Sequence, residues 1–98
     1  MNDIKRQVKG NRKFPLGQTV MTCGVDEQVP LEEVHEALER HQKGDWGQVC
    51  PDDWSENDQA LTAGARLLSA YTSKAGVKFW IITEWDRSVT TVLLPEEY

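Results

Sequence analysis

Two apolar runs late in the chain, separated by a short polar segment, predict a β-hairpin. Val77–Trp85 and Val89–Leu94 are rich in Val, Ile, Thr, Phe and Trp, which suit a pleated, half-buried surface. Large apolar side chains fall on both alternating faces of the first run, as is typical of a central strand. Residues 86–88 supply turn chemistry between the runs, and Pro95, which cannot donate to a strand ladder, ends the second.

The preceding chain predicts four more elements in the order strand, helix, helix, strand. The ranges are Gln18–Cys23, Pro30–Lys43, Pro51–Gly64 and Arg66–Ser73. The first strand is expected at an edge of the sheet, because proline and glycine flank it. Each helix begins with proline and stops at glycine, which is the usual asymmetry of helix ends.

Helical periodicity gives the 30–43 segment an apolar stripe formed by Leu31, Val34 and Leu38. His35 and His41 fall on the two flanks of this stripe. Each histidine is interpreted either as a general base or as a boundary residue that hydrogen-bonds through one nitrogen.

These elements predict an α+β fold, in which two amphipathic helices pack on one face of an antiparallel sheet of three to four strands. The sheet ends in a C-terminal β-meander. A length of 98 residues indicates one domain. We expect it to span residues 14–98, preceded by a basic, flexible arm over residues 1–13.

Charge is divided unevenly along the chain. The net charge is −5, but residues 14–98 alone carry −9. The body is therefore expected to repel nucleic acid over most of its surface. Contact with phosphates is expected only through five basic residues of the arm, which is alternatively a solvated leader. These residues are Lys5, Arg6, Lys9, Arg12 and Lys13.

Several classes of protein are excluded. No apolar run approaches the roughly 18 residues that span a bilayer, and the first residues lack the apolar core of a secretory signal. Cys23 and Cys50 lie far apart and have no metal-ligand spacing, which predicts two reduced thiols in a cytoplasmic protein. No cofactor or metal motif is present.

One polar cluster, residues 83–88, offers candidate catalytic chemistry. Arg87 could clamp a phosphate, and Glu84 could act as a base with His41 or His35 as the acid. Together with Thr91, this set would suit a small metal-independent ribonuclease. The alternative is an ion pair between Asp86 and Arg87 across a turn, with threonines that only favour strands.

Two tryptophans are candidate binding residues. Trp46 lies between two glycines, which predicts a sharp turn that places one aromatic ring. It is interpreted as a plug for the core edge or as a stacking platform. Trp85, Asp86 and Arg87 form the second candidate surface, because aromatic and arginine side chains often dominate interfaces.

Three motifs carry a family resemblance. They are Arg40–Gly47, Glu56–Tyr71 with its Gly64, and Trp80–Tyr98. Over residues 14–98 the chain resembles a family of small bacterial proteins carried by plasmids and phages. Its members are often labelled plasmid-related protein, or type I restriction endonuclease subunit M. A methylase subunit needs a far longer cofactor fold, so the resemblance implies mobile-element biology but no activity. Trp85 departs from the family, in which a small residue is expected.

The leading functional hypothesis is a small, acidic, non-enzymatic interaction protein of a mobile genetic element, which binds a host defence protein. The first alternative is a metal-independent ribonuclease or toxin that uses His41, Glu84, Arg87 and Thr91. The second is nucleic-acid binding through the basic N-terminal arm.

Overall fold

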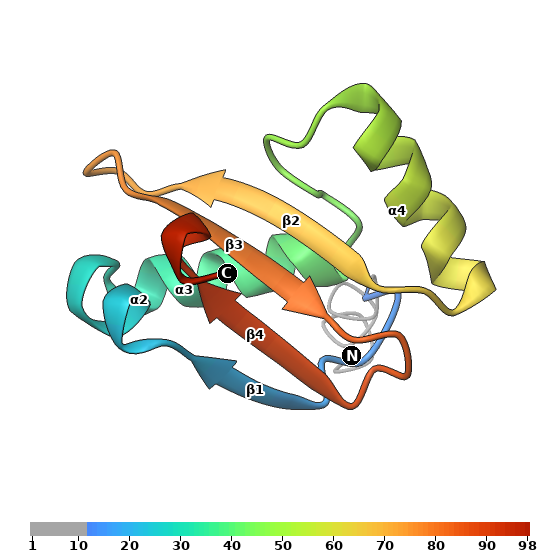
Figure 1. Cartoon of the computed structure of the whole chain (residues 1–98), viewed down its shortest axis with the longest axis horizontal. Helices are drawn as coiled ribbons and strands as arrows, with labels where there is room; N and C mark the ends of the chain where they lie inside the picture. Colours follow the sequence, from blue (N-terminus) through green and yellow to red (C-terminus); the bar gives the residue numbers. More distant parts are fainter. Residues whose placement is uncertain (1–11) are drawn as a thin grey trace, which may run out of the picture.

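The computed structural model describes residues 12–98, which form a mixed four-stranded sheet with helices behind it and beside it (Figure 1). The elements in chain order are β1 (Gln18–Met21), α2 (Cys23–Gln28), α3 (Leu31–Gln42), α4 (Pro51–Ala63), β2 (Leu67–Thr72), β3 (Lys78–Thr83), β4 (Val89–Leu93) and the 3₁₀ helix η1 (Pro95–Glu97). The predicted α+β fold with a C-terminal meander is confirmed.

The strand order across the sheet is β1-β4-β3-β2. The meander β2-β3-β4 is antiparallel, as predicted. β1 differs, because it runs parallel to β4 with Gln18 opposite Val89 and Met21 opposite Val92. A parallel neighbour needs a long crossover connection, and residues 22–88 provide it by passing through the three α-helices and the other two strands.

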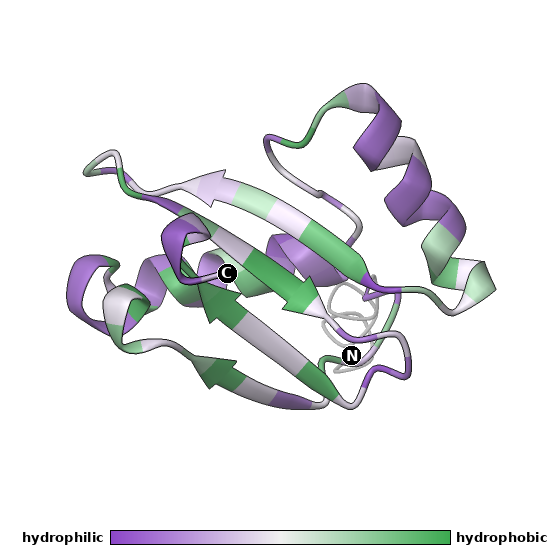
Figure 2. Ribbon diagram, viewed as in Figure 1, coloured by the Kyte–Doolittle hydropathy of each residue, from purple (hydrophilic) through white to green (hydrophobic). Residues whose placement is uncertain are grey.

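The main core lies behind the sheet, where α3 covers the strands (Figure 1). Phe79, Ile81 and Val92 point to this back face and are buried against Val34 and Ala37 of α3. Figure 2 shows hydrophobic residues along β3 and β4, and the alternation of a strand places Trp80 and Ile82 of β3 on the front face. The central-strand interpretation of the 77–85 run therefore holds, although the strand itself ends at Thr83.

Helix α3 presents a different stripe from the predicted one. Val34, Ala37 and His41 are buried, and Leu38 is partly buried. Leu31, the first residue of α3, is 58% exposed. The buried stripe follows the i, i+3, i+7 spacing of a helix and includes a histidine, which hydropathy alone assigns to a boundary.

A short helix, α2, was not predicted. The Thr22 side chain accepts a hydrogen bond from the Val25 backbone and so caps the helix start. Val25 and Val29 are buried in the main core. Six residues have no helical stability of their own, so tertiary packing rather than propensity sets this helix.

Helix α4 lies along the outer edge of β2 (Figure 1). The amide of Asn57 takes the place of a neighbouring strand, since it donates to the Leu68 carbonyl at 2.7 Å and accepts from the Leu68 N–H at 3.2 Å. The next outward-facing residue, Ala70, pairs with the backbone of Trp46 and Gln48. The outward-facing backbone groups of β2 at Leu68 and Ala70 therefore already have hydrogen-bond partners.

The segment before β1 enters a second apolar cluster made of Phe14, Trp46, Ala60 and Leu67. Arg12 and Lys13, the described part of the predicted basic arm, are exposed. Lys5, Arg6 and Lys9 lie outside the described residues. No helix within residues 12–98 is long and apolar enough to cross a bilayer.

We expect Gly47→Ala to destabilise the protein by several kcal/mol. Gly47 has φ of +77°, and a Cβ there would collide with the Ala70 carbonyl oxygen. Left-handed strain costs about 1–2 kcal/mol, and overpacking adds about 1–3 kcal/mol. Urea unfolding followed by circular dichroism measures the change.

The matched control is Gly76→Ala, since Gly76 has φ of +91° and open space around a new Cβ. It should show only the strain of about 1–2 kcal/mol. If the free energy of unfolding fell equally in the two variants, the contact of Gly47 with β2 would add nothing to the cost of the substitution.

Candidate functional site

His41, a predicted catalytic residue, lies on the last turn of α3 and is 0% exposed. Phe14 and Trp46 pack edge-on against its ring, with centroid distances of 5.2 Å and 5.5 Å. The ring is enclosed between two aromatic residues and the back of the sheet, so no substrate can reach it in this structure.

Both ring nitrogens of His41 are hydrogen-bonded in a buried chain. Nδ1 lies 2.5 Å from Ser69 Oγ, and Nε2 lies 2.8 Å from Thr83 Oγ1. Thr83 in turn pairs with Thr90 at 2.8 Å, and Thr90 donates to the Leu16 carbonyl at 2.7 Å.

The last acceptor fixes the direction of every bond in this chain. A carbonyl can only accept, so the Thr90 hydroxyl proton points at Leu16, and Thr90 must accept from Thr83. Thr83 then accepts from Nε2–H of His41, and Nδ1 accepts from Ser69. His41 is held as the neutral Nε2–H tautomer.

Burial, together with the smaller effect of the nearby positive charge of Arg87, lowers the pKa of His41 to about 3. At neutral pH the imidazole is therefore uncharged. With both nitrogens engaged and no solvent contact, it is poorly suited to general acid–base catalysis.

Arg87 acts as a clasp inside the molecule. It has φ of +61° at the turn between β3 and β4. Its guanidinium donates to the carbonyls of Ala65 at 2.6 Å, Ala60 at 2.9 Å and Glu84 at 3.1 Å, and it lies over the Phe14 ring at 5.7 Å. The group therefore fastens the hairpin to the end of α4.

This clasp also fits the electrostatics of α4. The carbonyl of Ala60 belongs to the last turn of the helix, where a cation is stabilised by the helix dipole. Desolvation lowers the pKa of Arg87, and the adjacent Asp86 partly opposes this. Backbone carbonyls already occupy the donors that the sequence analysis assigned to a phosphate or a partner.

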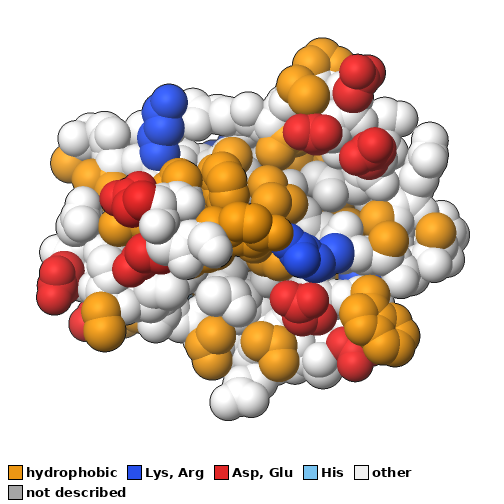
Figure 3. Space-filling view, in the orientation of Figure 1, with side chains coloured by type: hydrophobic (Ala, Val, Ile, Leu, Met, Phe, Trp, Pro, Cys, Tyr) orange, Lys and Arg blue, Asp and Glu red, His pale blue; other side chains and the backbone are white. Residues whose placement is uncertain are grey.

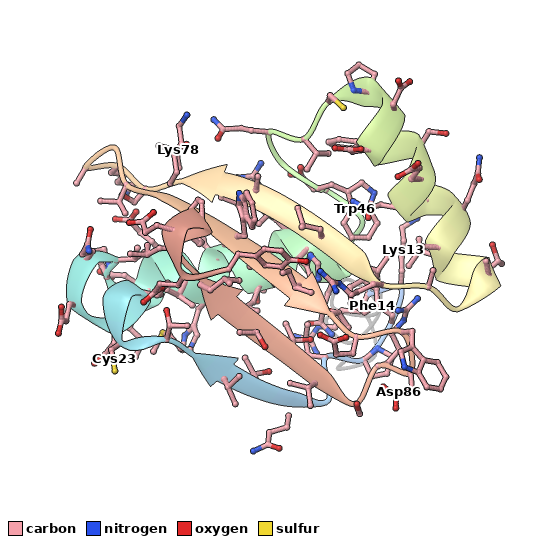
Figure 4. The ribbon with its side chains drawn as sticks, in the orientation of Figure 1. Lys13, Phe14, Cys23, Trp46, Lys78 and Asp86 are labelled. Atoms are coloured by element: carbon pink, nitrogen blue, oxygen red, sulfur yellow. The ribbon has the colours of Figure 1, made fainter. Side chains whose placement is uncertain are left out.

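Trp46 is 0% exposed, so it offers no surface to a partner. Its indole N–H donates to Asp58 at 3.0 Å, and its ring stacks near Phe14 at a centroid distance of 6.2 Å. Figure 4 places both rings close to the junction between β2 and α4. The glycines at 44 and 47 turn the loop inward, and Trp46 plugs the core edge.

Trp85 and Asp86 lie at the surface of the β3–β4 turn, as the binding hypothesis requires. Trp85 is 65% exposed. Asp86 lies near the outer end of the turn (Figure 4), where its carboxylate accepts from the Ser88 hydroxyl at 2.6 Å and backbone at 3.1 Å. These bonds lower the pKa of Asp86. Asp86 therefore shapes the turn, and no ion pair joins it to Arg87.

The proposed ribonuclease set does not converge. Thr91 and Glu84 line the same shallow pocket on the front of the sheet, whereas His41 is buried behind it and hydrogen-bonds Thr83 on the back face. His35 is exposed on α3. The sheet itself separates the acid and base that the reaction would need.

No group of three or more His, Cys, Asp or Glu side chains in residues 12–98 is arranged to hold a metal ion. Comparison of the chain with known protein families, curated proteins and solved structures finds no match.

The front of the sheet carries a surface that the sequence analysis did not name. Strand register places its members on one face, and the ring of Tyr98 lies across them, 5.7 Å from Trp80. This front patch consists of Leu68, Trp80, Ile82, Leu93 and Tyr98. Figure 3 shows hydrophobic side chains gathered over the middle of the sheet. The two-sided apolar pattern of the 77–85 run was the available signal.

Within residues 12–98, no α-helix lies over the front patch, and only the C-terminal segment with its 3₁₀ helix η1 reaches it. The C-terminal segment covers it only partly, and Tyr98, bonded through its hydroxyl to Arg66 at 2.5 Å, remains 69% exposed. Glu97 holds this segment in place, because it accepts hydrogen bonds from the Thr22 hydroxyl and the Gly24 backbone.

We expect stability to fall as pH falls from 6.5 toward 5, through His41. Its folded pKa of about 3 lies below the unfolded value of 6.5, so the unfolded chain takes up a proton first. The free energy of unfolding should then fall by up to about 1.4 kcal/mol per pH unit. Urea unfolding at several pH values measures this slope.

His41→Met should remove most of that slope, whereas His35→Gln, which changes an exposed histidine on the same helix, should keep it. If the free energy of unfolding changed with pH equally in the parent and in His41→Met, His41 would not be a buried neutral histidine.

Arg87→Lys should destabilise the protein by about 1–3 kcal/mol, because one ammonium cannot serve three separated carbonyls. Arg40→Lys is the control, since Arg40 is 51% exposed in its surface pair with Asp45. It should change stability by less than about 1 kcal/mol. Thermal unfolding compares the two variants, and similar losses of stability would argue against the role of Arg87 as a clasp.

Proposed function

We propose that this chain is a non-enzymatic interaction protein that binds a partner protein through the front patch. One observation carries the proposal: no α-helix of the described chain covers the front of the sheet, where Tyr98 is 69% exposed and Leu68 and Trp80 are partly exposed, while Ile82 and Leu93 are buried. An aromatic-rich apolar face bordered by charged residues is the usual anatomy of a protein interface.

The internal hydrogen bonds and burial of the candidate catalytic side chains support binding over catalysis. His41 and Arg87 are engaged in internal hydrogen bonds, and Trp46 is buried. The exposed side chains instead include carboxylates, several lysines and arginines, and the aromatic residues Trp85 and Tyr98, with Trp80 partly exposed. Such a surface can recognise a partner through aromatic and charged side chains.

The biological setting belongs to the same proposal. The resemblance to proteins of plasmids and phages suggests an accessory factor of a mobile element that acts in the bacterial cytoplasm. Its partner would then be a host protein, such as a defence factor. The acidic body disfavours nucleic acid as a ligand of this surface.

Site-specific photocross-linking in bacterial cells tests the front patch. Replacing Tyr98 by benzoylphenylalanine keeps an aromatic group at an exposed position. We expect one discrete cross-linked host protein, which is lost when Trp80→Ala removes the neighbouring ring. The same probe at His35, which is exposed on α3 behind the sheet, should give no such product.

Absence of a product from the Tyr98 position, or identical products from both positions, would count against the proposal. Metal-free RNA cleavage that disappears in His41→Ala, with the fold intact by circular dichroism, would favour the ribonuclease alternative instead.

A further inference from the structure

A groove runs between α4 and β2, next to the front patch. It has a cavity volume of about 460 Å³. Its lining includes two carboxylates, three alanines and one leucine: Asp53, Glu56, Ala60, Ala63, Ala65 and Leu68. Asn57, Gln59 and the cation Arg66 complete the lining. The groove joins the front patch at Leu68 and at Arg66, which also lines the pocket that holds Tyr98.

The α4 wall of this groove changes character along its length. The spacing of Asp53, Glu56, Ala60 and Ala63 places them on one helix face, with the acids at the start and the alanines at the end. In Figure 2 the helix is largely hydrophilic and turns apolar toward its C-terminal end. The groove is acidic at one end and apolar at the other.

The carboxylates of this wall have no ion-pair partner among residues 12–98, although Arg66 lines the same groove. Helix α4 holds four acidic residues and no basic residue. Among the described residues, Asp53 and Glu56 form no hydrogen bond or ion pair, whereas Asp58 is bonded to Trp46. Figure 3 shows acidic side chains grouped over α4. A partner that brings positive charge would gain attraction here without displacing an internal cation.

The floor of the groove restricts the shape of the partner. An extended peptide would need free backbone groups on the edge of β2, but Asn57 and the 46–48 segment occupy those of Leu68 and Ala70. A helix satisfies its own backbone and presents only side chains. Because these backbone groups of β2 are already paired, a helical partner is favoured over an added strand.

From these features we infer that the groove between α4 and β2 receives a cationic amphipathic helix of the partner protein. Arginine or lysine side chains of that helix pair with Asp53 and Glu56. Its apolar side chains pack on Ala63, Leu68 and the adjoining front patch. This inference rests on the proposed function and specifies the partner that the front patch recognises.

The test uses the full chain and a labelled 18-residue model helix built from leucine, alanine and arginine on an amphipathic pattern. A second peptide carries glutamate at every arginine position. Fluorescence anisotropy should show salt-sensitive binding of the arginine helix and none of the glutamate helix. Asp53→Lys/Glu56→Lys should weaken binding of the arginine helix at least tenfold.

The matched control is Glu36→Lys/Glu39→Lys on α3, which makes the same charge change at the same i, i+3 spacing on an exposed face. It should weaken binding less than threefold. Ala63→Gln should also weaken binding, because it fills the apolar end, while the salt dependence stays. Equal effects of the two double variants would overturn the inference, since attraction would then follow net charge alone.

Two further outcomes would also overturn it. One is tight binding of an extended peptide of the same length and arginine content, in which prolines replace alanines to prevent a helix. The other is sedimentation of the free protein as a dimer that Asp53→Lys/Glu56→Lys dissociates, because a second copy would then fill the groove. If the Tyr98 cross-link persists in Asp53→Lys/Glu56→Lys, the proposed function stands and only the helix inference fails.

Discussion

The hydrogen-bond chain through His41 is the interaction on which the rest of the structure depends. It joins α3 to β2 through Ser69 and to β3 through Thr83, and it continues through β4 to the carbonyl of Leu16. Each member is buried, so each would cost free energy if its partner were lost. One neutral tautomer satisfies all of them, and this sets how α3 and the segment before β1 sit on the sheet.

Phe14 connects this chain to the rest of the second cluster. Its ring lies against His41 and Trp46, and the Arg87 guanidinium lies over it. Arg87 then reaches the end of α4. The histidine, arginine and tryptophan that the sequence analysis singled out are therefore gathered in one place, where they hold α3, the sheet and α4 together. Proximity alone does not make an active site when every donor has an internal acceptor.

The consequence for function is a division between interior and surface. The interior engages the histidine and the Arg87 cation. On the outside of α4, Asp53 and Glu56 have no ion-pair partner among residues 12–98 and lie beside an apolar sheet face. Carboxylates next to exposed aromatic and aliphatic groups favour association with a basic, amphipathic partner. The ribonuclease hypothesis fails for the same reason, because its acid, His41, belongs to the interior behind the sheet and its base, Glu84, lies on the front.

By itself, the sequence determined the elements with strong local signals and their approximate limits. The β-branched and aromatic runs near residues 80 and 91, and the proline starts and glycine stops of α3 and α4, act within a few residues of each other. The α+β class followed from their order. Tertiary structure decided the features that depend on contacts between residues far apart in the chain. Those features include the parallel pairing of β1 with β4, the capped helix α2 held by Val25 and Val29, and the burial of His41. A histidine on a helix flank can be a base or a core residue, and only Ser69 and Thr83, far away in the chain, settle which. The turn residues Trp85 and Asp86 were placed at the surface by local chemistry alone, whereas Trp46 and Arg87 turned inward because Asp58, Ala60 and Ala65 offered acceptors that no local pattern reveals.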